Sequence, residues 1–384
     1  MTQTVLVIDD EVAVAEGIAE ALVCGGRTIF VCNDAESAEV LLESVTPAAI
    51  ICDVRLTGPF RFEGLDFLDY VARHAPGAAV ILISGAVSPE LRTEAQRRGA
   101  RAIVEKPFEV SEIEAFLEAC TDDGDGDVVY IPTFDEIIGS EGLQPQFQPI
   151  VDLQRGGVLG FESLARHATT SPFSNPQVLF DYAARKMRVA DLEIACMRGA
   201  FHAAPDLGDH RLLFMNLHPA ALADCDRLYE LLARESATRR IPLDRVVLEL
   251  TEQSHLPNDA RTHQNIERLR TLGVRFAFDD VGTAYSHLPL IDRIRPAFLK
   301  VSQHFGTGFE IDSARSKLVS NLLSLARDFD ASLILEGIES NETAAAARAL
   351  GIPFGQGYFY ARPLKTTDAS EYANGNVLTG NRVT

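Results

Sequence analysis

The second half of the chain contains short apolar runs that each end at, or include, a polar side chain able to bind a cation. The clearest one, Val274–Thr283, passes from apolar residues directly into Asp279 and Asp280. Two adjacent carboxylates at a strand end repel each other unless a positive charge lies between them. The corresponding residues of the other runs are Glu162, Asn216, Glu249, Lys300 and Glu336. A solvated strand end could explain any one of them, whereas the set predicts a metal site whose oxygen ligands favour Mg²⁺ or Mn²⁺ over zinc.

These residues lie in a series of strand-like runs, most of them separated by amphipathic stretches of helix length. The runs are Gln146–Val151, Val158–Leu164, Leu212–Leu217, Val246–Leu250, Val274–Asp279, Ala297–Val301, Ser332–Leu335 and Gly357–Tyr360. Eight such runs predict a (β/α)₈ barrel, in which active sites lie at the C-terminal ends of the strands. An uncompensated carboxylate in a strand buried on both faces would cost several kcal/mol, which also favours a metal site.

The first 120 residues show a different alternation of strand-like and helix-like segments. Their apolar runs are Val5–Ile8, Thr28–Cys32, Ala48–Cys52, Ala78–Ile83 and Ala102–Val104. This pattern predicts an α/β domain with a doubly wound, flavodoxin-like parallel sheet. Polar residues follow the strands, namely Asp9, Asp10, Asp53, Ser84 and Lys106, at the edge where such sheets bind ligands. The carboxylates could hold Mg²⁺, and the lysine and hydroxyl would suit a phosphoryl group on one of the acids.

Composition limits the function classes. A chain of 384 residues predicts two domains. Its net charge of −20 argues against direct nucleic-acid binding, which needs a basic face. No apolar run approaches the roughly 20 residues of a membrane span, and the N-terminus does not resemble a signal peptide. The cysteines form no CxxC pair, which is typical of reduced, buried thiols in a cytoplasmic protein; they are Cys24, Cys32, Cys52, Cys120, Cys196 and Cys225.

The boundary between the domains is marked by the acidic, glycine-rich stretch Thr121–Asp127. Its spaced aspartates resemble a calcium loop only faintly, because the glutamate at the twelfth position and the flanking helices of an EF-hand are missing. We therefore expect domains at 1–120 and 143–367, a linker at 121–142 that includes a short helix at Phe134–Ile138, and a polar tail at 368–384.

The polar residues of the first domain resemble those of the response-regulator receiver domain. Asp9 and Asp10 match its acidic pair, which binds one Mg²⁺, and Asp53 matches its phosphoacceptor. Ser84 matches its switch hydroxyl, and Lys106 matches its lysine before proline, often across a cis bond. The resemblance implies transfer of a phosphoryl group from a cognate histidine kinase to Asp53.

Two features differ from the usual receiver pattern. Ile103 occupies the position of an aromatic switch residue, and the loop Thr57–Glu63 looks longer than usual. The aromatic residues of this loop could cover the site or contact a partner.

The second domain resembles the EAL-type cyclic di-GMP phosphodiesterases. The opening segment FQPIVDLQRGGVLGFESLARH contains Glu162-Ser163-Leu164 in place of the signature triplet. Further motifs follow in the family's order: MNL at 215–217, ELTE at 249–252, DDVGT at 279–283, LK at 299–300, EGIE at 336–339 and QGY at 356–358. The resemblance implies hydrolysis of cyclic di-GMP to linear pGpG with two Mg²⁺ or Mn²⁺ ions. It also implies a homodimer.

The resemblance assigns each motif residue a role. The first metal ion would be bound by Glu162, Asn216, Glu249 and Asp279. Asp279 would bridge to the second ion, with Asp280 on that side. Lys300 and Glu336 would hold the water or complete the metal site, and Glu252 would restrain the loop after Asp280. Arg166 would contact a phosphate, and Gln356, Glu339 and Leu164 would orient the substrate.

Some departures from the active pattern favour an alternative function. Val281, Ala284 and His287 alter the loop after the acidic pair, and Ser302 replaces an aspartate near the second metal. His167 replaces a common tryptophan, and Ala183-Ala184 replaces an Ala-Glu pair. The alternative is a weak or inactive barrel that senses cyclic di-GMP or binds a protein partner.

Overall fold

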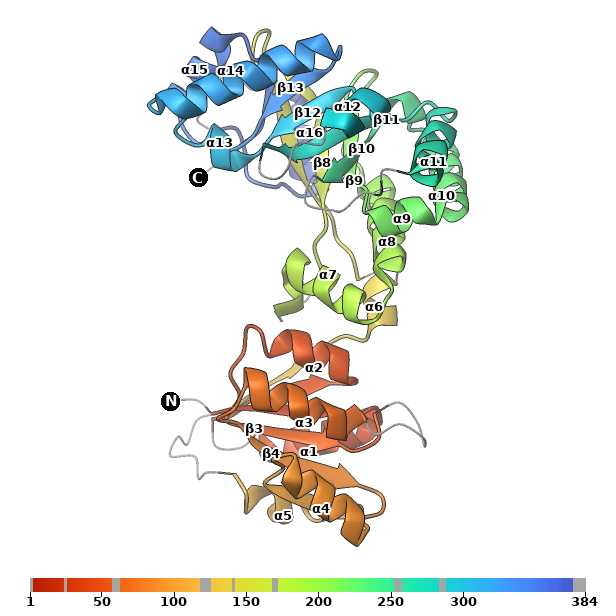
Figure 1. Ribbon diagram of the computed structural model, residues 1–384, viewed down its shortest axis with the longest axis vertical. Helices are drawn as coiled ribbons and strands as arrows, with labels where there is room; N and C mark the ends of the chain where they lie inside the picture. The colour runs from red at the N-terminus through yellow and green to blue at the C-terminus, as the bar shows by residue number, and fades with distance from the viewer. Residues whose placement is uncertain are drawn as a thin grey trace. The chain divides into compact units, whose positions relative to one another are not determined.

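The computed structural model describes residues 3–23, 26–56, 63–117, 126–139, 142–167, 172–251, 257, 259–282 and 288–375. The chain forms two compact units. The first contains the described residues up to Ile137 together with His167–Met187, and the second contains Ile138–Arg166 and the described residues from Arg188 onward. Figure 1 labels their helices and strands. Residues 57–62 of the long first-domain loop and residues 121–125 of the linker lie outside the described ranges.

The first unit is built on a parallel sheet with the strand order β5-β4-β3-β1-β2-β6. Its strands are β1 (Thr4–Ile8), β2 (Thr28–Cys32), β3 (Ala49–Asp53), β4 (Ala79–Ser84), β5 (Ala102–Glu105) and β6 (Asp127–Tyr130). The intervening helices are α1 (Val12–Leu22), α2 (Ala35–Leu41), α3 (Glu63–His74), α4 (Pro89–Arg97) and α5 (Val110–Glu114). α1 contacts α5, and α2 contacts α3, so the sheet is covered on both faces. The predicted doubly wound sheet is confirmed.

Part of the predicted linker belongs to this sheet. β6 pairs in parallel with β2, from Thr28 opposite Asp127 to Val31 opposite Tyr130. Gly126 allows the approach, because a Cβ there would lie 2.2 Å from the Arg27 carbonyl oxygen and 2.3 Å from that of Val23. The predicted linker at 121–142 is therefore wrong at residues 127–130, which form a strand of the first unit. The β-branched pair before Tyr130 favours a strand, and this strand hydrogen-bonds to the edge of β2 that would otherwise be free.

Two helices that follow β6 in sequence also belong to the first unit in whole or in large part. The short helix expected at α6 (Phe134–Ile138) is present. The 3₁₀ turn η1 (Pro172–Ser174) leads into α7 (Pro176–Arg185), where Asn175 caps the helix by accepting a hydrogen bond of 3.0 Å from the Gln177 amide. α7 packs against α2.

The second unit contains a closed eight-stranded barrel with the order β10-β11-β12-β13-β14-β7-β8-β9. Its strands are β7 (Gln146–Asp152), β8 (Val158–Leu164), β9 (Leu212–Asn216), β10 (Val246–Thr251), β11 (Arg275–Val281), β12 (Phe298–Val301), β13 (Ser332–Leu335) and β14 (Phe354–Gly355). The predicted barrel is confirmed in its strand number and closure. It differs from eight identical β/α units because β7 runs antiparallel to both of its neighbours.

The eighth strand was predicted at the wrong residues. Gly357–Tyr360 forms a turn, in which the Tyr360 amide donates to the Gly357 carbonyl at 3.0 Å, and the strand is formed by Phe354–Gly355. A Cβ on Gly355 would meet the side chains of Ile338 and Leu153 at 2.5 and 3.0 Å. The barrel therefore closes where a residue without a side chain fits, although the more apolar run comes later in the sequence.

Helices surround the barrel, and several of them are visible around its strands in Figure 1. They are α8 (Val189–Ala203), α9 (Pro219–Ala223), α10 (Cys225–Arg239), α11 (Ala260–Arg270), α12 (Leu288–Ile294), α13 (Gln303–Gly306), α14 (Ser313–Asp328), α15 (Asn341–Leu350) and α16 (Thr366–Asn374), with a 3₁₀ turn η2 (Leu243–Arg245). Within the described ranges, none of the helices is long and apolar enough to cross a membrane.

The predicted polar tail begins too early. α16 continues the second unit to Asn374 and contacts β7, and its residues Ala369 and Ala373 are buried in the main apolar cluster. Two alanines spaced four apart form a narrow buried face, while the rest of the helix is polar. The composition of the segment therefore suggests a polar tail although the helix is packed. Residues 376–384 lie outside the described ranges.

The thiol prediction is supported where the structure describes it. Cys32, Cys52, Cys196 and Cys225 are free, and all but Cys196 are buried. Cys24 and Cys120 lie outside the described residues.

The barrel has two apolar layers separated by its strands. The larger cluster fills the space between strands and helices, with alternate strand residues such as Leu213, Leu248, Phe276 and Leu299. The smaller cluster takes the intervening residues and fills the interior: Ile150, Leu212, Phe214, Val247, Ala277, Phe298 and Ile334. This alternation positions the functional site described below.

Candidate metal centres

The predicted barrel residues form one layer next to the interior apolar cluster. Residues two apart along a strand face the same side of the sheet. Each of five site residues follows a member of the interior cluster by two positions: Asn216 follows Phe214, Glu249 follows Val247, Asp279 follows Ala277, Lys300 follows Phe298, and Glu336 follows Ile334. The strand alternation therefore directs these polar groups to a common place at the C-terminal ends of the strands.

Lys300 lies at the centre of this layer. Its Nζ is 2.9 Å from Glu336 Oε1 and 3.0 Å from Glu249 Oε1. Glu162 Oε2 and Asp279 Oδ1 are each 3.2 Å from the same nitrogen. The Lys300 and Glu249 side chains are fully buried. Carboxylates from four different strands or strand ends therefore surround one ammonium group out of contact with bulk water.

The electrostatic balance of this group is unfavourable without further cations. Burial raises the pKa of Glu249 well above its ordinary value and raises the pKa of Glu336 to about 8, although Lys300 opposes both shifts. Burial alone would lower the pKa of Lys300, but the surrounding carboxylates raise it well above its ordinary value. Because one ammonium offsets only one of four carboxylates, the others must take up protons or bind cations.

The residues fit a bound divalent cation. Oxygen atoms of Glu162, Glu249 and Asp279 all lie within 4.8 Å of one another. Among the described residues, neither carboxylate oxygen of Glu249 accepts a hydrogen bond, although Lys300 Nζ is near one of them. Buried oxygens without hydrogen bonds are what an oxygen-liganded cation such as Mg²⁺ or Mn²⁺ would complete.

A local irregularity of β11 positions the acidic pair. The pairing of β11 with β12 shifts between Phe278 and Val281, so Asp279 and Asp280 form a bulge. Asp280 has a positive φ of 56°, and its amide donates to Asp279 Oδ1 at 2.9 Å. The left-handed residue allows two consecutive acids to point in different directions from the strand end.

Two glutamines connect the acids to the antiparallel strand. Gln356 Nε2 donates to Glu162 Oε2 at 2.7 Å and to Gln148 Oε1 at 3.0 Å, and Gln148 Nε2 donates to the Ala361 carbonyl at 3.1 Å. Sequence analysis included Gln356 but missed Gln148. Gln148 precedes the interior residue Ile150 by two positions, because β7 runs in the opposite direction. The sequence feature that could have identified Gln148 is a polar residue within an otherwise mostly apolar strand-like run.

The other predicted substrate residues occupy the ends of the strands. Leu164 is the last residue of β8, and Arg166 follows it. Burial lowers the pKa of the half-buried Arg166, while the charges of Tyr358 and Glu162 act in the opposite direction. Glu339 follows β13 by four residues and is exposed, outside the group that surrounds Lys300.

The departures from the active pattern have partly visible consequences. Ser302 is buried and caps α13 by accepting a hydrogen bond from the His304 amide at 3.5 Å. Its hydroxyl oxygen therefore has a partner within its own helix cap. Val281 is buried in the main apolar cluster. Glu252, Ala284 and His287 lie outside the described residues.

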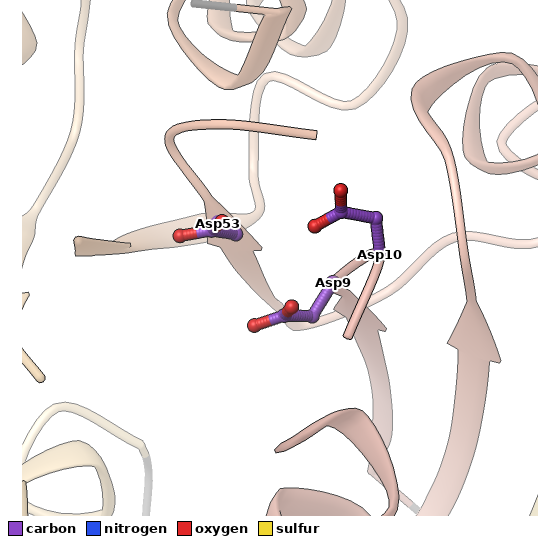
Figure 2. A group of neighbouring side chains, drawn as sticks. All are labelled: Asp9, Asp10 and Asp53. Carbon is purple, nitrogen blue, oxygen red and sulfur yellow. The ribbon is translucent and has the colours of Figure 1, made fainter. Parts of the chain in front are cut away.

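The acids predicted in the first unit also converge. Oxygens of Asp9, Asp10 and Asp53 lie within 4.8 Å of one another. Figure 2 shows Asp53 at the end of its strand and Asp9 and Asp10 just beyond the end of a neighbouring one. Burial, followed by the charge of Asp9, raises the pKa of Asp53 to about 6. A divalent cation would offset this repulsion.

Lys106 contacts this acid cluster although it lies 97 residues after Asp9 in the sequence. Its Nζ donates to Asp9 Oδ2 at 2.8 Å and lies 3.6 Å from Asp53 Oδ1. Burial alone would lower the pKa of Lys106, but the hydrogen bond and charge of Asp9 raise it above its ordinary value. The peptide bond between Lys106 and Pro107 is cis, as the sequence pattern suggested.

Ser84 and Ile103 occupy the positions expected for a switch. Ser84 is the last residue of β4, and its hydroxyl donates to the Ala86 carbonyl at 2.9 Å. Ile103 is buried on β5. Because this residue has no ring, an aromatic rotamer change at this position is excluded.

Fold and site geometry define a receiver-type α/β unit followed by a barrel with a buried acidic group that could hold a metal ion. Comparison with known proteins agrees: residues 5–118 match the response regulator receiver domain, and residues 134–363 match the EAL domain. The chain belongs to the EAL domain family and is a response regulator with an N-terminal receiver domain.

One curated protein is similar to this chain across both domains. The chain is 27% identical to the cyclic di-GMP phosphodiesterase RocR of Pseudomonas aeruginosa, over 97% of this chain and 99% of RocR. Further curated relatives match smaller parts, and the chain spans only 25% to 46% of their length.

Solved structures share the fold of the barrel. A manganese and cyclic di-GMP complex of BlrP1 from Klebsiella pneumoniae has 26% identity and a TM-score of 0.53, covering 58% of this chain and 56% of that one. The EAL enzyme Bd1971, bound to cAMP and cyclic di-GMP, has a TM-score of 0.57 over 63% of this chain and 67% of that one. Its 22% identity shows a common fold alone.

Proposed function

We propose that the barrel hydrolyses one phosphodiester bond of cyclic di-GMP to give linear pGpG, under control of the receiver domain. The observation that carries the proposal is the buried group of four carboxylates around Lys300. A protein that only binds a nucleotide does not need so many uncompensated buried acids. The end-to-end likeness to RocR supports the same substrate and the same combination of domains.

The chain supplies ligands for two Mg²⁺ or Mn²⁺ ions. Glu162, Asn216, Glu249 and Asp279 would hold the first, and Asp279, Asp280 and Glu336 would hold the second. Such ions, when bound, supply a nucleophilic hydroxide at neutral pH and offset charge on the phosphate. The burial of Glu162, Glu249 and Asp279 supports this assignment, because a bound cation would neutralise charges that are otherwise costly to bury.

Lys300 has a separate part in the proposed reaction. Its ammonium group is held among the carboxylates in a site closed to bulk water, where it can donate hydrogen bonds to the attacking water or the phosphate. Glu336, whose Oε1 lies 2.9 Å from Lys300 Nζ, would help to hold the same water. Both groups would therefore act directly on the reacting atoms.

Residues around the metal layer would position the substrate. Arg166 would bind a phosphate oxygen, and Leu164 and Glu339 would contact the rest of the nucleotide. Gln356 and Gln148 orient Glu162 through the hydrogen bonds described above, which supports a positioning role. Glu252 would restrain the loop that follows Asp280.

In the receiver, we propose that Asp53 accepts a phosphoryl group from a histidine kinase. Asp9 and Asp10 would hold one Mg²⁺ beside it, and Lys106 and Ser84 would bind the transferred group. The proximity of Lys106 to Asp53 supports this role. The family resemblance supports a homodimer, and the free thiols support a reducing, cytoplasmic location.

One observation favours a second candidate function. The hydroxyl of Ser302 caps α13 where the active pattern has an aspartate, so an acid is missing near the proposed second metal. A barrel with one weakly held ion would bind cyclic di-GMP and act as a sensor without efficient hydrolysis. The two functions differ in whether pGpG appears.

The test is to incubate the full chain with cyclic di-GMP and either Mg²⁺ or Mn²⁺ and to follow pGpG by chromatography. Glu162→Ala removes a ligand and the acceptor of Gln356, so we expect its rate to fall about 100-fold or more. Glu230→Ala, on the exposed side of α10, should keep the wild-type rate. Tight binding of cyclic di-GMP with no pGpG in either metal would contradict the enzyme and support the sensor.

A further inference from the structure

Helix α7 belongs to the EAL domain in sequence but packs in the receiver unit. It lies within residues 134–363, which match the EAL domain. Its residues nevertheless fall in the compact unit formed by the receiver, and the helix contacts α2. The receiver unit therefore contains a helix that the barrel domain contributes.

The polar contacts between the two helices are complementary in charge. Arg185, the last residue of α7, forms ion pairs with Glu39 and Glu43. Lys186 Nζ lies 3.1 Å from both Asp34 Oδ2 and Glu36 Oε2. Two cations at the end of α7 thus contact four acids on or beside α2. We call these acids, Asp34, Glu36, Glu39 and Glu43, the acidic face of α2.

A buried aromatic residue anchors the same helix. Tyr182 is fully buried, and its hydroxyl donates to Asp34 Oδ2 at 2.7 Å. Its ring meets Phe134 and Phe173 edge to face, with ring centroids 5.6 and 5.4 Å apart. Together with the ion pairs, this apolar contact makes a specific interface, since partly buried charges count for more than solvent-exposed ones.

The acidic face begins two residues after a backbone contact with the acid cluster of the receiver. Asp34 caps α2 by accepting a hydrogen bond from the Ser37 amide at 2.8 Å. Two residues earlier, the Cys32 carbonyl accepts a hydrogen bond of 3.2 Å from the Asp9 amide. The turn that presents Asp34 to Tyr182 is therefore bonded to a residue of the proposed Mg²⁺ site.

On the barrel side, the chain segment before α7 carries Arg166. β8, which contains Glu162, ends at Leu164, and Arg166 is the last residue of the second unit before the chain enters the first. The Arg166 carbonyl accepts a hydrogen bond of 2.8 Å from the Gln144 amide. After α7 the chain returns to the second unit at Arg188. Arg166 is thus joined to α7 by residues 167–175, of which the structure describes His167 and the residues from Pro172 onward.

We propose that the acidic face of α2 is the surface through which the receiver holds α7, and that this docking positions Arg166 for substrate binding. The link to substrate rests on the proposed phosphodiesterase function, whereas the docking itself does not. Arg166 is then the residue through which α7 acts on the barrel. Loss of docking should weaken substrate binding more than the chemical step.

The test is a charge exchange in the full chain, read by hydrogen–deuterium exchange and by kinetics. We expect Arg185→Glu and Glu39→Arg each to speed exchange of amides in Pro176–Arg185 about tenfold, because the docked helix opens more often. Exchange in residues 158–167 should rise with it, and KM for cyclic di-GMP should rise severalfold with little change in kcat. The double variant Glu39→Arg/Arg185→Glu should recover most of each effect.

Controls separate docking from general damage. Arg239→Glu changes the corresponding last residue of α10, which is exposed, and should leave exchange in α7 unchanged. Tyr182→Phe removes only the hydroxyl that contacts Asp34 and should give a smaller increase in exchange without loss of folding.

Four outcomes decide the proposal. The proposal is overturned if both single variants keep the wild-type exchange rate in α7. It is also overturned if exchange becomes faster in α7 but does not change in residues 158–167. Faster exchange in both segments with an unchanged KM would overturn the role of Arg166. If the wild-type chain makes no pGpG, the phosphodiesterase function fails, and the exchange measurements alone decide the docking.

Discussion

At the residue scale, the chain concentrates its chemistry in a few buried charges. Lys300 is the ammonium group at the centre of the barrel site, and its environment would be strongly repulsive if that charge were removed. A buried network of this kind is costly for the fold, and such networks are common at functional sites. Its energetics can therefore be tested apart from catalysis.

Lys300→Met should destabilise the chain in metal-free buffer by about 3–5 kcal/mol, because four buried carboxylates lose their shared counter-charge. Millimolar Mg²⁺ should restore part of this loss, since the ion would take over that role. Urea unfolding with and without Mg²⁺ measures both effects. Lys317→Met, on the outer helix α14, is the control, and equal stability of the two variants without metal would refute the explanation.

Glu193 is a buried acid that sequence analysis did not identify. It lies on α8, only 2% exposed, and burial raises its pKa to about 8, although the His218 amide acts in the opposite direction. The folded chain therefore binds this proton more tightly than the unfolded chain, whose ordinary value is 4.5. Its contribution to stability is full below pH 4.5 and is lost as the pH rises toward 8.

Glu193→Gln has no proton to lose, so its free energy of unfolding should fall less between pH 5 and pH 8 than that of the wild type. The difference in slope should amount to on the order of 3 kcal/mol over this range. Denaturant titrations at several pH values give the two curves. Parallel curves would mean that folding does not raise the pKa of Glu193.

At the element scale, the site depends on strand direction and on two irregularities. The antiparallel β7 contributes Gln148 from the opposite sequence direction, and the bulge in β11 separates Asp279 from Asp280. In the receiver, β6 extends the sheet beyond the five strands that its sequence pattern predicts. Each feature depends on a small number of backbone contacts.

Gly126→Ala should detach β6 from β2, because the added Cβ would lie within 2.3 Å of two carbonyl oxygens. We expect faster amide exchange in β6 and a loss of about 1–3 kcal/mol in stability. Gly17→Ala is the matched control, since a Cβ at that helical position meets nothing within 4 Å. It should stabilise α1 by about 0.5–1 kcal/mol; similar behaviour of the two variants would contradict the proposed contact.

On the scale of the whole molecule, the chain passes three times between its units, at Ile137–Ile138, Arg166–His167 and Met187–Arg188. The second and third crossings enclose α7, so the receiver and the barrel are connected by more than one linker. If phosphorylation changes the docking of α7, the same coupling free energy acts on the receiver and on the barrel.

Acetyl phosphate should change the rate of pGpG formation severalfold in the wild-type chain, in either direction. Asp53→Asn should abolish the response because it removes the proposed phosphoacceptor, and Arg185→Glu should reduce the response while keeping Asp53. The readout is the ratio of rates with and without acetyl phosphate, with phosphorylation followed by intact mass. An unreduced response in Arg185→Glu would show that control reaches the barrel by another route.

The sequence by itself determined the two sheet architectures and most of the chemical groups. Parallel strands bring their C-terminal ends to one edge, so acids that close consecutive runs must meet there, as Glu162, Glu249 and Asp279 do. The same reasoning brought Asp53 together with Asp9 and Asp10. Local pattern was sufficient because the strand period fixes which residues share a side.

Only the tertiary structure decided where elements with weak local signals belong. The direction of β7, the pairing of β6, the last barrel strand at Phe354–Gly355 and the burial of α16 depend on contacts between residues distant in sequence. The placement of α7 on α2 is of the same kind. Its cations and Tyr182 contact acids about 150 residues away in the sequence. No local sequence pattern predicts contacts over such a distance.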